Sequence, residues 1–343
     1  MQVKCPFPII DCGPLYDEPG STVAHRVIDM ICDSGRRYGF LLLANTNVNW
    51  PKVERAFRTW RQFLQQITAS PELAQNLARN PDTNLGLTGN GDMVFDPARP
   101  GDGNISMRIH NEPSHFGDAW IPAPKGAAWA GYYNGKNKVP LWMPELEIHM
   151  LAALAEAGAL FGGTVLKAYE TGLSLKLPEV AYDPKHSLVR ALAYVASSVA
   201  LSPGQRWTSP HTDFGFGSVV FQDGVAGLRA NIGGVWVPIP APQRVAIVNN
   251  ADLMAKFYDG LLPSIEHDVD ELAPTVDRLS IACFEYYNWT AFLPDGEVFG
   301  DHIWKRLRTT TNRGQDAKAP AIDVAGSLAS YIGARLELEG PPA

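Results

Sequence analysis

The stretch Ser209–Asp223, SPHTDFGFGSVVFQD, decides both the fold and the chemistry that we expect of this chain. It places His211 and Asp213 two positions apart, ahead of small and apolar residues. Side chains two apart in a β-strand point to the same face, so a strand here would present an imidazole and a carboxylate side by side. A lone His-x-Asp pair is weak evidence in a chain with eight histidines, so its meaning depends on what else the sequence supplies.

Residues that could complete a metal site follow later in the chain. His267 lies in LLPSIEHDVD, and Arg278 and Ser280 follow in RLS, again two positions apart. Two histidines and one carboxylate leave other positions of a metal open, an arrangement that suits non-heme Fe(II) oxygenases. An arginine with a neighbouring hydroxyl can hold a carboxylate through forked, charge-assisted hydrogen bonds. The set therefore predicts iron with open positions and a clamp for a keto acid.

The pattern around these residues is typical of a β-sandwich or barrel. Between residues 187 and 288, short β-rich runs alternate with turn residues, and Gly233-Gly234 predicts a hairpin. Residues 6–48 have the pattern strand, helix, strand, and residues 50–67 that of an amphipathic helix. Residues 80–140 are rich in Gly, Pro, Asn and Asp, which predicts long loops with short strands.

We expect one integrated globular unit with three regions. Residues 1–140 would form an N-terminal region of helices and substrate-side loops, and residues 141–310 a helix with the β-rich catalytic core. That helix starts near Pro144 and is expected to be interrupted at Gly162-Gly163. Residues 311–343 would form a helical tail that ends in the helix VAGSLASYIGARLEL.

The totals of the sequence exclude several classes of protein. A net charge of −7 argues against a nucleic-acid partner or an anionic membrane, which would favour a basic face. The four cysteines form no CxxC pair, which indicates reduced thiols and leaves metal binding to His and carboxylate residues. No apolar run near the length of a membrane span is evident, and prolines interrupt the N-terminus where a signal peptide needs an apolar helix. We therefore expect a cytoplasmic protein.

The order HTD, H, RLS resembles the iron/2-oxoglutarate-dependent dioxygenases of the isopenicillin N synthase-like group. FPIID, GFLLLAN, FQD, GGVWVPIP, VNNADLM and RLSIACFEYYN are similar to further motifs of that group, so the likeness spans roughly residues 6–310. The resemblance implies a mainly β fold with flanking helices, a distorted double-stranded β-helix or jelly roll. It also implies an oxygenase that uses Fe(II), 2-oxoglutarate and O2 to oxidise a small molecule in secondary metabolism, by hydroxylation, desaturation or cyclisation.

The same resemblance assigns roles to particular residues. His211, Asp213 and His267 match the iron ligands. Arg278 and Ser280 match the pair that holds the far carboxylate of 2-oxoglutarate, and Tyr194 in RALAY matches a tyrosine that assists them. Asp268 departs from the pattern, since the group usually has Arg after the distal histidine.

A substrate-binding role is predicted for Arg108 and His110, which share one face of a short strand within the loop-rich region. A solvated strand edge is the alternative. In that case Trp129 and Trp142 are the next candidates for lining a substrate pocket, although aromatic residues more often serve as packing.

A second metal site at His110, Glu112 and His115 is not expected, because Pro113 prevents a helix there and the spacing fits no known metal motif. For the whole chain two other functions stay open. One is a 2-oxoglutarate-independent oxidase like isopenicillin N synthase, and the other is a non-catalytic jelly-roll binding protein.

Overall fold

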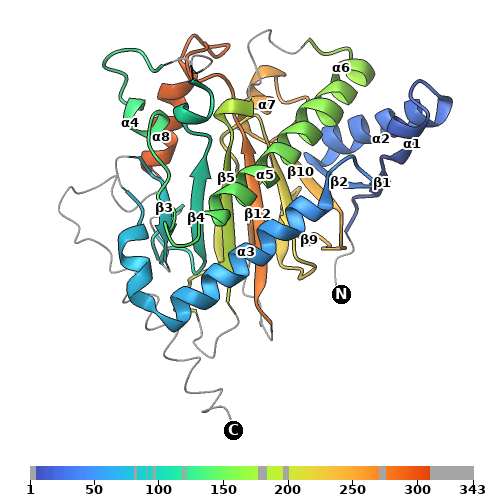
Figure 1. Cartoon of the computed structure of the whole chain (residues 1–343). Helices are drawn as coiled ribbons and strands as arrows, with labels where there is room; N and C mark the ends of the chain where they lie inside the picture. The colour runs from blue at the N-terminus through green and yellow to red at the C-terminus, as the bar shows by residue number, and fades with distance from the viewer. Residues whose placement is uncertain are drawn as a thin grey trace.

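A computed structural model describes residues 5–80, 83–89, 91–95, 98–117, 120, 122–176, 184–195, 201–269 and 276–309 (Figure 1). The helix predicted within residues 311–343 lies outside these residues. The strands are β1 (Ile9–Asp11), β2 (Phe40–Ala44), β3 (Gly86–Thr88), β4 (Ile105–His110), β5 (Leu188–Tyr194), β6 (Thr208–His211), β7 (Gly217–Gln222), β8 (Leu228–Ile232), β9 (Val235–Pro238), β10 (Ala246–Asn250), β11 (His267–Val269) and β12 (Arg278–Glu285). The helices are α1 (Gly13–Asp17), α2 (Thr22–Tyr38), α3 (Trp50–Ala69), α4 (Ala130–Tyr133), α5 (Glu145–Leu160), α6 (Lys167–Leu173), α7 (Asp252–Phe257) and α8 (Phe299–Thr309), with short 3-10 turns at Pro71–Leu77, Pro113–His115 and Pro184–His186.

Two sheets form the centre of the molecule, as expected of a double-stranded β-helix. The large sheet has the order β1-β2-β10-β7-β12-β5-β4-β3, and the small sheet has the order β6-β11-β8-β9. All of these strand pairs are antiparallel except β1 with β2. The predicted hairpin joins β8 and β9 through Gly233 and Gly234, both with positive φ, the conformation that a tight two-residue turn requires.

The registers of three strand pairs set up the functional region. His211 on β6 lies opposite His267 on β11. On the other sheet, Arg278 on β12 lies opposite Tyr194 on β5, and Arg108 on β4 lies opposite Arg190 on β5. Because side chains alternate along a strand, a shift of one residue in any pair would turn these groups to the other face.

Helices α3 and α5 cover one face of the large sheet (Figure 1). Both helices follow from apolar residues at helical spacing, and Trp60 of α3 is fully buried. Its indole Nε1 donates to the backbone oxygen of Leu192 on β5 at 3.2 Å, which fastens the helix to the central strands. On such a scaffold, replacing Trp60 with Ala would cost about 3–5 kcal/mol of stability.

The interruption predicted at Gly162-Gly163 is a π-helical turn, Phe161–Leu166, that joins α5 to α6 without a break. The helical stretch Glu145–Leu173 is therefore long and apolar enough, by length and composition, to cross a membrane, with a mean hydropathy of 1.4. The expectation that the chain has no such run is therefore wrong. Half of its most apolar window is buried inside the protein, where α5 packs on α3, β4, β5 and β12, and this is the environment of a core helix.

One local expectation differs from the structure. Strand β6 ends at His211, so Asp213 lies in the following loop and does not share a strand face with the histidine. The carboxylate of Asp213 is instead held by hydrogen bonds from Ser218 of β7 and Asn249 of β10.

Candidate metal centre and adjoining cavities

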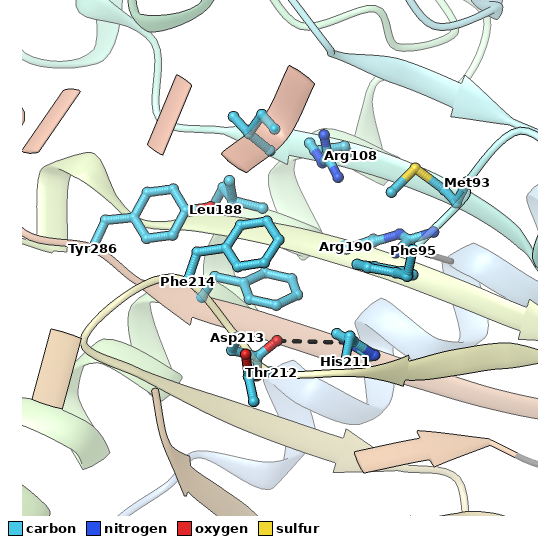
Figure 2. A pocket seen from close by; sticks show the side chains of 12 residues that line it. Met93, Phe95, Arg108, Leu188, Arg190, His211, Thr212, Asp213, Phe214 and Tyr286 are labelled. Carbon is cyan, nitrogen blue, oxygen red and sulfur yellow. Dashed lines mark ion pairs between the residues drawn. The ribbon is translucent and has the colours of Figure 1, made fainter. Parts of the chain in front are cut away.

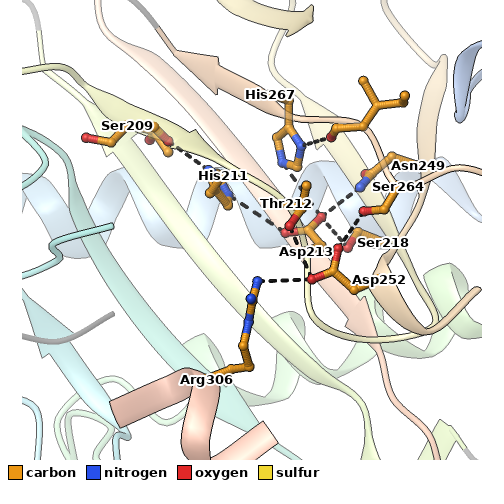
Figure 3. A network of polar contacts seen from close by, with 12 residues as sticks. Ser209, His211, Thr212, Asp213, Ser218, Asn249, Asp252, Ser264, His267 and Arg306 are labelled. Atoms are coloured by element: carbon orange, nitrogen blue, oxygen red, sulfur yellow. Dashed lines mark hydrogen bonds and ion pairs between the residues drawn. The ribbon is translucent and has the colours of Figure 1, made fainter. Parts of the chain in front are cut away.

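His211, Asp213 and His267 come together beside strands β6 and β11 of the small sheet (Figure 3). Their candidate ligand atoms all lie within 4.8 Å of one another. His211 Nε2 is 3.8 Å from Asp213 Oδ1, and His267 Nε2 is 3.7 Å from Asp213 Oδ2. All three side chains are largely buried, so a cation placed between them would be shielded from bulk water.

Both imidazoles are oriented by the backbone two residues before them. His211 Nδ1 lies 2.8 Å from the carbonyl oxygen of Ser209, and His267 Nδ1 lies 3.1 Å from that of Ile265. A carbonyl can only accept, so each Nδ1 carries the proton and each Nε2 presents its lone pair to the centre. Burial, together with His267, lowers the pKa of His211 well below its usual value, which keeps that imidazole neutral.

The carboxylate of Asp213 is fixed by two residues that the sequence analysis did not identify. Ser218 Oγ and Asn249 Nδ2 both donate to Oδ2, at 2.6 Å and 2.8 Å. Burial alone would raise the pKa of Asp213, but the two histidines and these hydrogen bonds lower it overall, so the side chain is an anion. Ser218 and Asn249 lie opposite each other on β7 and β10, a pairing that the sequence alone does not reveal.

Thr212, which lies between His211 and Asp213 in the chain, is also fixed by a hydrogen bond. Thr212 donates to Asp252 Oδ2, and the same oxygen accepts from Arg306 of α8 at 3.0 Å, while Oδ1 accepts from Ser264 (Figure 3). The Arg306 guanidinium also stacks over the ring of Phe214, 4.4 Å from its centroid. These contacts connect α8 to the loop that carries Asp213.

These donors fit a resident divalent metal such as Fe(II). Two neutral imidazole nitrogens and one carboxylate converge, each with its other polar atom already hydrogen-bonded. Among the described residues this is the single cluster of three or more such side chains close enough to hold an ion. His110, Glu112 and His115 are not members of this cluster.

One cavity beside the triad contains the residues predicted to bind 2-oxoglutarate: Tyr194, Arg278 and Ser280. Arg278 is 1% exposed, and its Nη1 has no hydrogen-bond partner among the described residues. Its other nitrogens are anchored, since Nη2 donates to Gln222 Oε1 at 2.9 Å and Nε to the Val225 carbonyl at 3.2 Å. A buried guanidinium with one free donor fits the far carboxylate of a keto acid.

Tyr194 lies in this cavity mainly as a support for the guanidinium. Its ring centroid is 4.6 Å from Arg278 Cζ, a cation–π contact, and its hydroxyl is 3.3 Å from Thr208 Oγ1. Asp268, which departs from the family pattern, forms part of the same cavity wall. It is fully buried and accepts from Arg229 at 2.6 Å and from Arg206 at 2.7 Å, so the arginines that neutralise it come from other positions in the chain.

A second cavity lies on the other side of His211 and Asp213 and contains Arg108 and Arg190 (Figure 2). The centre of a water-sized sphere can reach about 40 Å³ of this cavity, and all the space not filled by protein atoms, open mouth included, is about 440 Å³. Arg108 is 9% exposed, which rules out a solvated strand edge at this position. His110 is directed elsewhere: its Nε2 lies 2.8 Å from the Gly135 carbonyl, and it lines a separate small pocket.

The two tryptophans named as alternative pocket candidates do not line this cavity. Trp129 is buried in an aromatic cluster with Trp289 and Tyr133, and Trp142 is exposed and stacks on Phe63. Arg190, which the sequence analysis missed, lines both cavities. An arginine within the otherwise apolar strand run VRALAYV is the signal that could have identified it.

Comparisons with known proteins agree with this arrangement. Residues 188–285 match the model of the 2OG-Fe(II) oxygenase superfamily. The chain is 23% identical over 311 residues to a 1-aminocyclopropane-1-carboxylate oxidase homolog of Solanum lycopersicum, covering 89% of this chain and 78% of that protein. It is 24% identical over 301 residues to a 2-oxoglutarate-dependent dioxygenase of Didymella fabae, covering 81% and 84%.

The fold is also that of solved structures. A full-length Neurospora crassa protein, crystallised in complex with alpha-KG, superposes with a TM-score of 0.69 at 21% identity, covering 88% of this chain and 96% of that one. In this chain, the segment matched by the family model contains all three converging ligands and Arg278, whereas Arg108 lies outside it.

Proposed function

We propose, from the premise that this chain belongs to the 2OG-Fe(II) oxygenase superfamily, that it oxidises an unactivated C–H bond of a small organic molecule. The chain is a non-heme Fe(II)/2-oxoglutarate-dependent dioxygenase. The observation that carries the proposal is the pair of cavities that meet at His211 and Asp213, because a co-substrate and a substrate can then reach the same metal. As in the group that the sequence resembles, we place the reaction in secondary metabolism and in the cytoplasm.

Iron bound with 2-oxoglutarate supplies an oxidant derived from dioxygen, while 2-oxoglutarate is converted to succinate and carbon dioxide. His211, Asp213 and His267 would hold the iron through Nε2, a carboxylate oxygen and Nε2. The backbone contacts at both Nδ1 atoms keep the imidazoles in the ligating tautomer. Ser218 and Asn249 keep Asp213 in place, so little reorganisation accompanies metal binding.

On the co-substrate side, the free Nη1 of Arg278 would bind the far carboxylate of 2-oxoglutarate, with Ser280 two residues on along the same strand face. On the other side, Phe95 stacks on His211 with centroids 4.3 Å apart. This ring shields the metal-binding histidine from water and leaves an apolar surface against which a substrate can be oriented.

Dioxygen uptake tests the proposal. The protein, reconstituted anaerobically with Fe(II), should consume dioxygen and form succinate only when 2-oxoglutarate is present, and a candidate substrate should accelerate both. Substrate-dependent uptake without 2-oxoglutarate would identify an oxidase like isopenicillin N synthase. Iron and ligand binding without any uptake across a broad substrate panel would instead identify a binding protein.

A further inference from the structure

Arg108 differs from the other buried cations near the metal centre because the described residues offer it almost no partner. It lies on β4, is 9% exposed and lines the cavity beside His211 and Asp213. Its one hydrogen bond among the described residues is from Nη1 to the Asn84 carbonyl at 3.3 Å, a long contact. Its Nε has no acceptor, and no carboxylate among the described residues forms an ion pair with it.

Arg190, directly opposite Arg108 on β5, has its hydrogen bonds made by other residues of the protein. Its Nε donates to Ser106 Oγ at 2.8 Å, and its Nη2 donates to Asn104 Oδ1 at 3.2 Å. Asp102 supplies the nearby negative charge, although burial raises the pKa of this carboxyl to about 6. Burial, and then repulsion by Arg108, lower the pKa of Arg190 to about 10.

Arg108 therefore forms no ion pair with a carboxylate of the described residues. Asp102, the buried carboxyl group nearby, is associated with Arg190, on which Arg79 acts as a further positive charge. A buried charge without a partner is strongly unfavourable, so a fold that retains one at a cavity wall has use for a ligand of opposite sign. The unpaired guanidinium of Arg108 therefore favours an anionic ligand.

The rest of the cavity wall is apolar. The side chains that form it next to the arginines are Phe95, Leu188, Phe214, Phe284, Tyr286 and Leu307. Figure 2 shows Arg108 on the wall across from Asp213 and His211, with the aromatic rings between them. A ligand bound to Arg108 by one end would thus extend over apolar surface toward the metal ligands.

We infer that the substrate is a monocarboxylate with an apolar body, bound by its carboxylate to Arg108. This inference rests on the proposed function and specifies its substrate class. The planar guanidinium favours a carboxylate, which can accept two parallel hydrogen bonds from it. Binding at Arg108 directs the far, apolar end of the molecule toward the metal, so oxidation takes place on a carbon remote from the carboxylate.

Paired ligands test the inference. The probes are a panel of aromatic and alicyclic monocarboxylic acids, each matched with its primary carboxamide. Anaerobic calorimetry with protein loaded with Fe(II) and 2-oxoglutarate measures their binding without turnover. At least one acid should bind roughly tenfold to a hundredfold more tightly than its amide, the difference expected for hydrogen bonds to a charged group. Absence of any such preference across the panel would overturn the inference.

Three variants show whether Arg108 causes the preference. Arg108→Gln should abolish the discrimination between acid and amide, and Arg108→Lys should retain part of it, because the charge remains but the fork is lost. Arg37→Gln, on the exposed side of α2, makes the same change in net charge away from the cavity and should behave like the wild type. Equal loss in Arg37→Gln, or full discrimination in Arg108→Gln, would contradict the assignment.

Two measurements separate this inference from the proposed function. Arg108→Gln should still bind 2-oxoglutarate as tightly as the wild type, which also shows that the variant is folded. The acid probe should not be displaced by excess 2-oxoglutarate, since displacement would place it at Arg278. Wild-type protein that fails to bind 2-oxoglutarate would refute the proposed function itself, whereas normal 2-oxoglutarate binding without acid preference would refute only the substrate class.

Discussion

The two cavities that meet at the triad each contain a buried arginine, but the surroundings of these arginines differ. Arg278 is held on three sides by Gln222, the Val225 carbonyl and the ring of Tyr194. Arg108 has a single long contact to a backbone carbonyl among the described residues. The first guanidinium is fixed in advance for one ligand, and the second leaves most of its hydrogen-bonding capacity to a ligand. The difference is what we expect if, as proposed, Arg278 binds the constant co-substrate and Arg108 binds a substrate that completes its own binding site.

The largest effect should come from removing the three side chains of the candidate metal centre. Asp213→Ala, His211→Ala or His267→Ala should each abolish most iron binding, because three protein ligands are all that the described residues provide. Iron content after anaerobic reconstitution measures this, with Arg278→Lys as a control that keeps its iron. Stoichiometric iron in the three ligand variants would disprove the assignment.

The next largest effect should distinguish Arg278 from Arg108 by their contributions to 2-oxoglutarate affinity. Arg278→Lys should weaken 2-oxoglutarate binding by roughly tenfold to a hundredfold, because a charge-assisted hydrogen bond contributes about 1.5–3 kcal/mol. Arg108→Lys should leave that affinity unchanged. Titration with 2-oxoglutarate under anaerobic conditions gives both values. Equal losses in the two variants would mean that the cavities are not specialised as we describe.

Asp268, in the wall of one cavity, should also contribute to the free energy of unfolding of the protein. Asp268 lines the co-substrate cavity and neutralises Arg206 and Arg229, both about one quarter exposed. Asp268→Asn deprives these arginines of this anion and should lower the free energy of unfolding by about 2 kcal/mol, below the loss for a fully buried pair. Chemical denaturation measures it. Arg37→Gln, which breaks an exposed ion pair, should change it by less than about 0.5 kcal/mol.

The smallest effect concerns pH. Burial lowers the pKa of His110, behind the substrate-side wall on β4, to about 4. The unfolded chain therefore binds a proton between about pH 6.5 and 4 that the native protein does not, so stability falls as pH decreases through this range. Relative to His110→Gln, the wild type should lose about 1–2 kcal/mol between pH 7 and pH 5. A constant difference between the two proteins across this range would contradict the shift.

Much of the fold followed from local patterns. Short apolar runs bounded by turn residues predicted β5, β7, β9, β10 and β12, since the ends of these strands are marked by glycine, proline or polar residues. The three candidate metal ligands could be predicted because their order along the chain is distinctive. The position of Asp213 outside β6 could not, because a strand end depends on pairing partners that local sequence does not specify.

The residues that hold Asp213 and its loop in place could not be predicted from the sequence, for the same reason. Ser218 and Asn249 reach Asp213 because β7 pairs with β10 in one particular register. Arg306 reaches Asp252 because α8 packs back over the β-rich region. Serine, asparagine and arginine are frequent residues, and nothing in their local sequence distinguishes these from the surface copies elsewhere in the chain.

The position of β4 and α8 has a consequence for how such proteins diversify. The segment 188–285 contains the three ligands and Arg278, while Arg108 on β4 and Leu307 on α8 flank the same metal from outside it. The candidate metal ligands and Arg278 thus lie within one continuous part of the chain, while the cavity proposed for the substrate takes its wall from inside and outside that part. Exchanging β4 and α8 between two such chains would therefore alter the wall of that cavity and leave the candidate metal ligands in place.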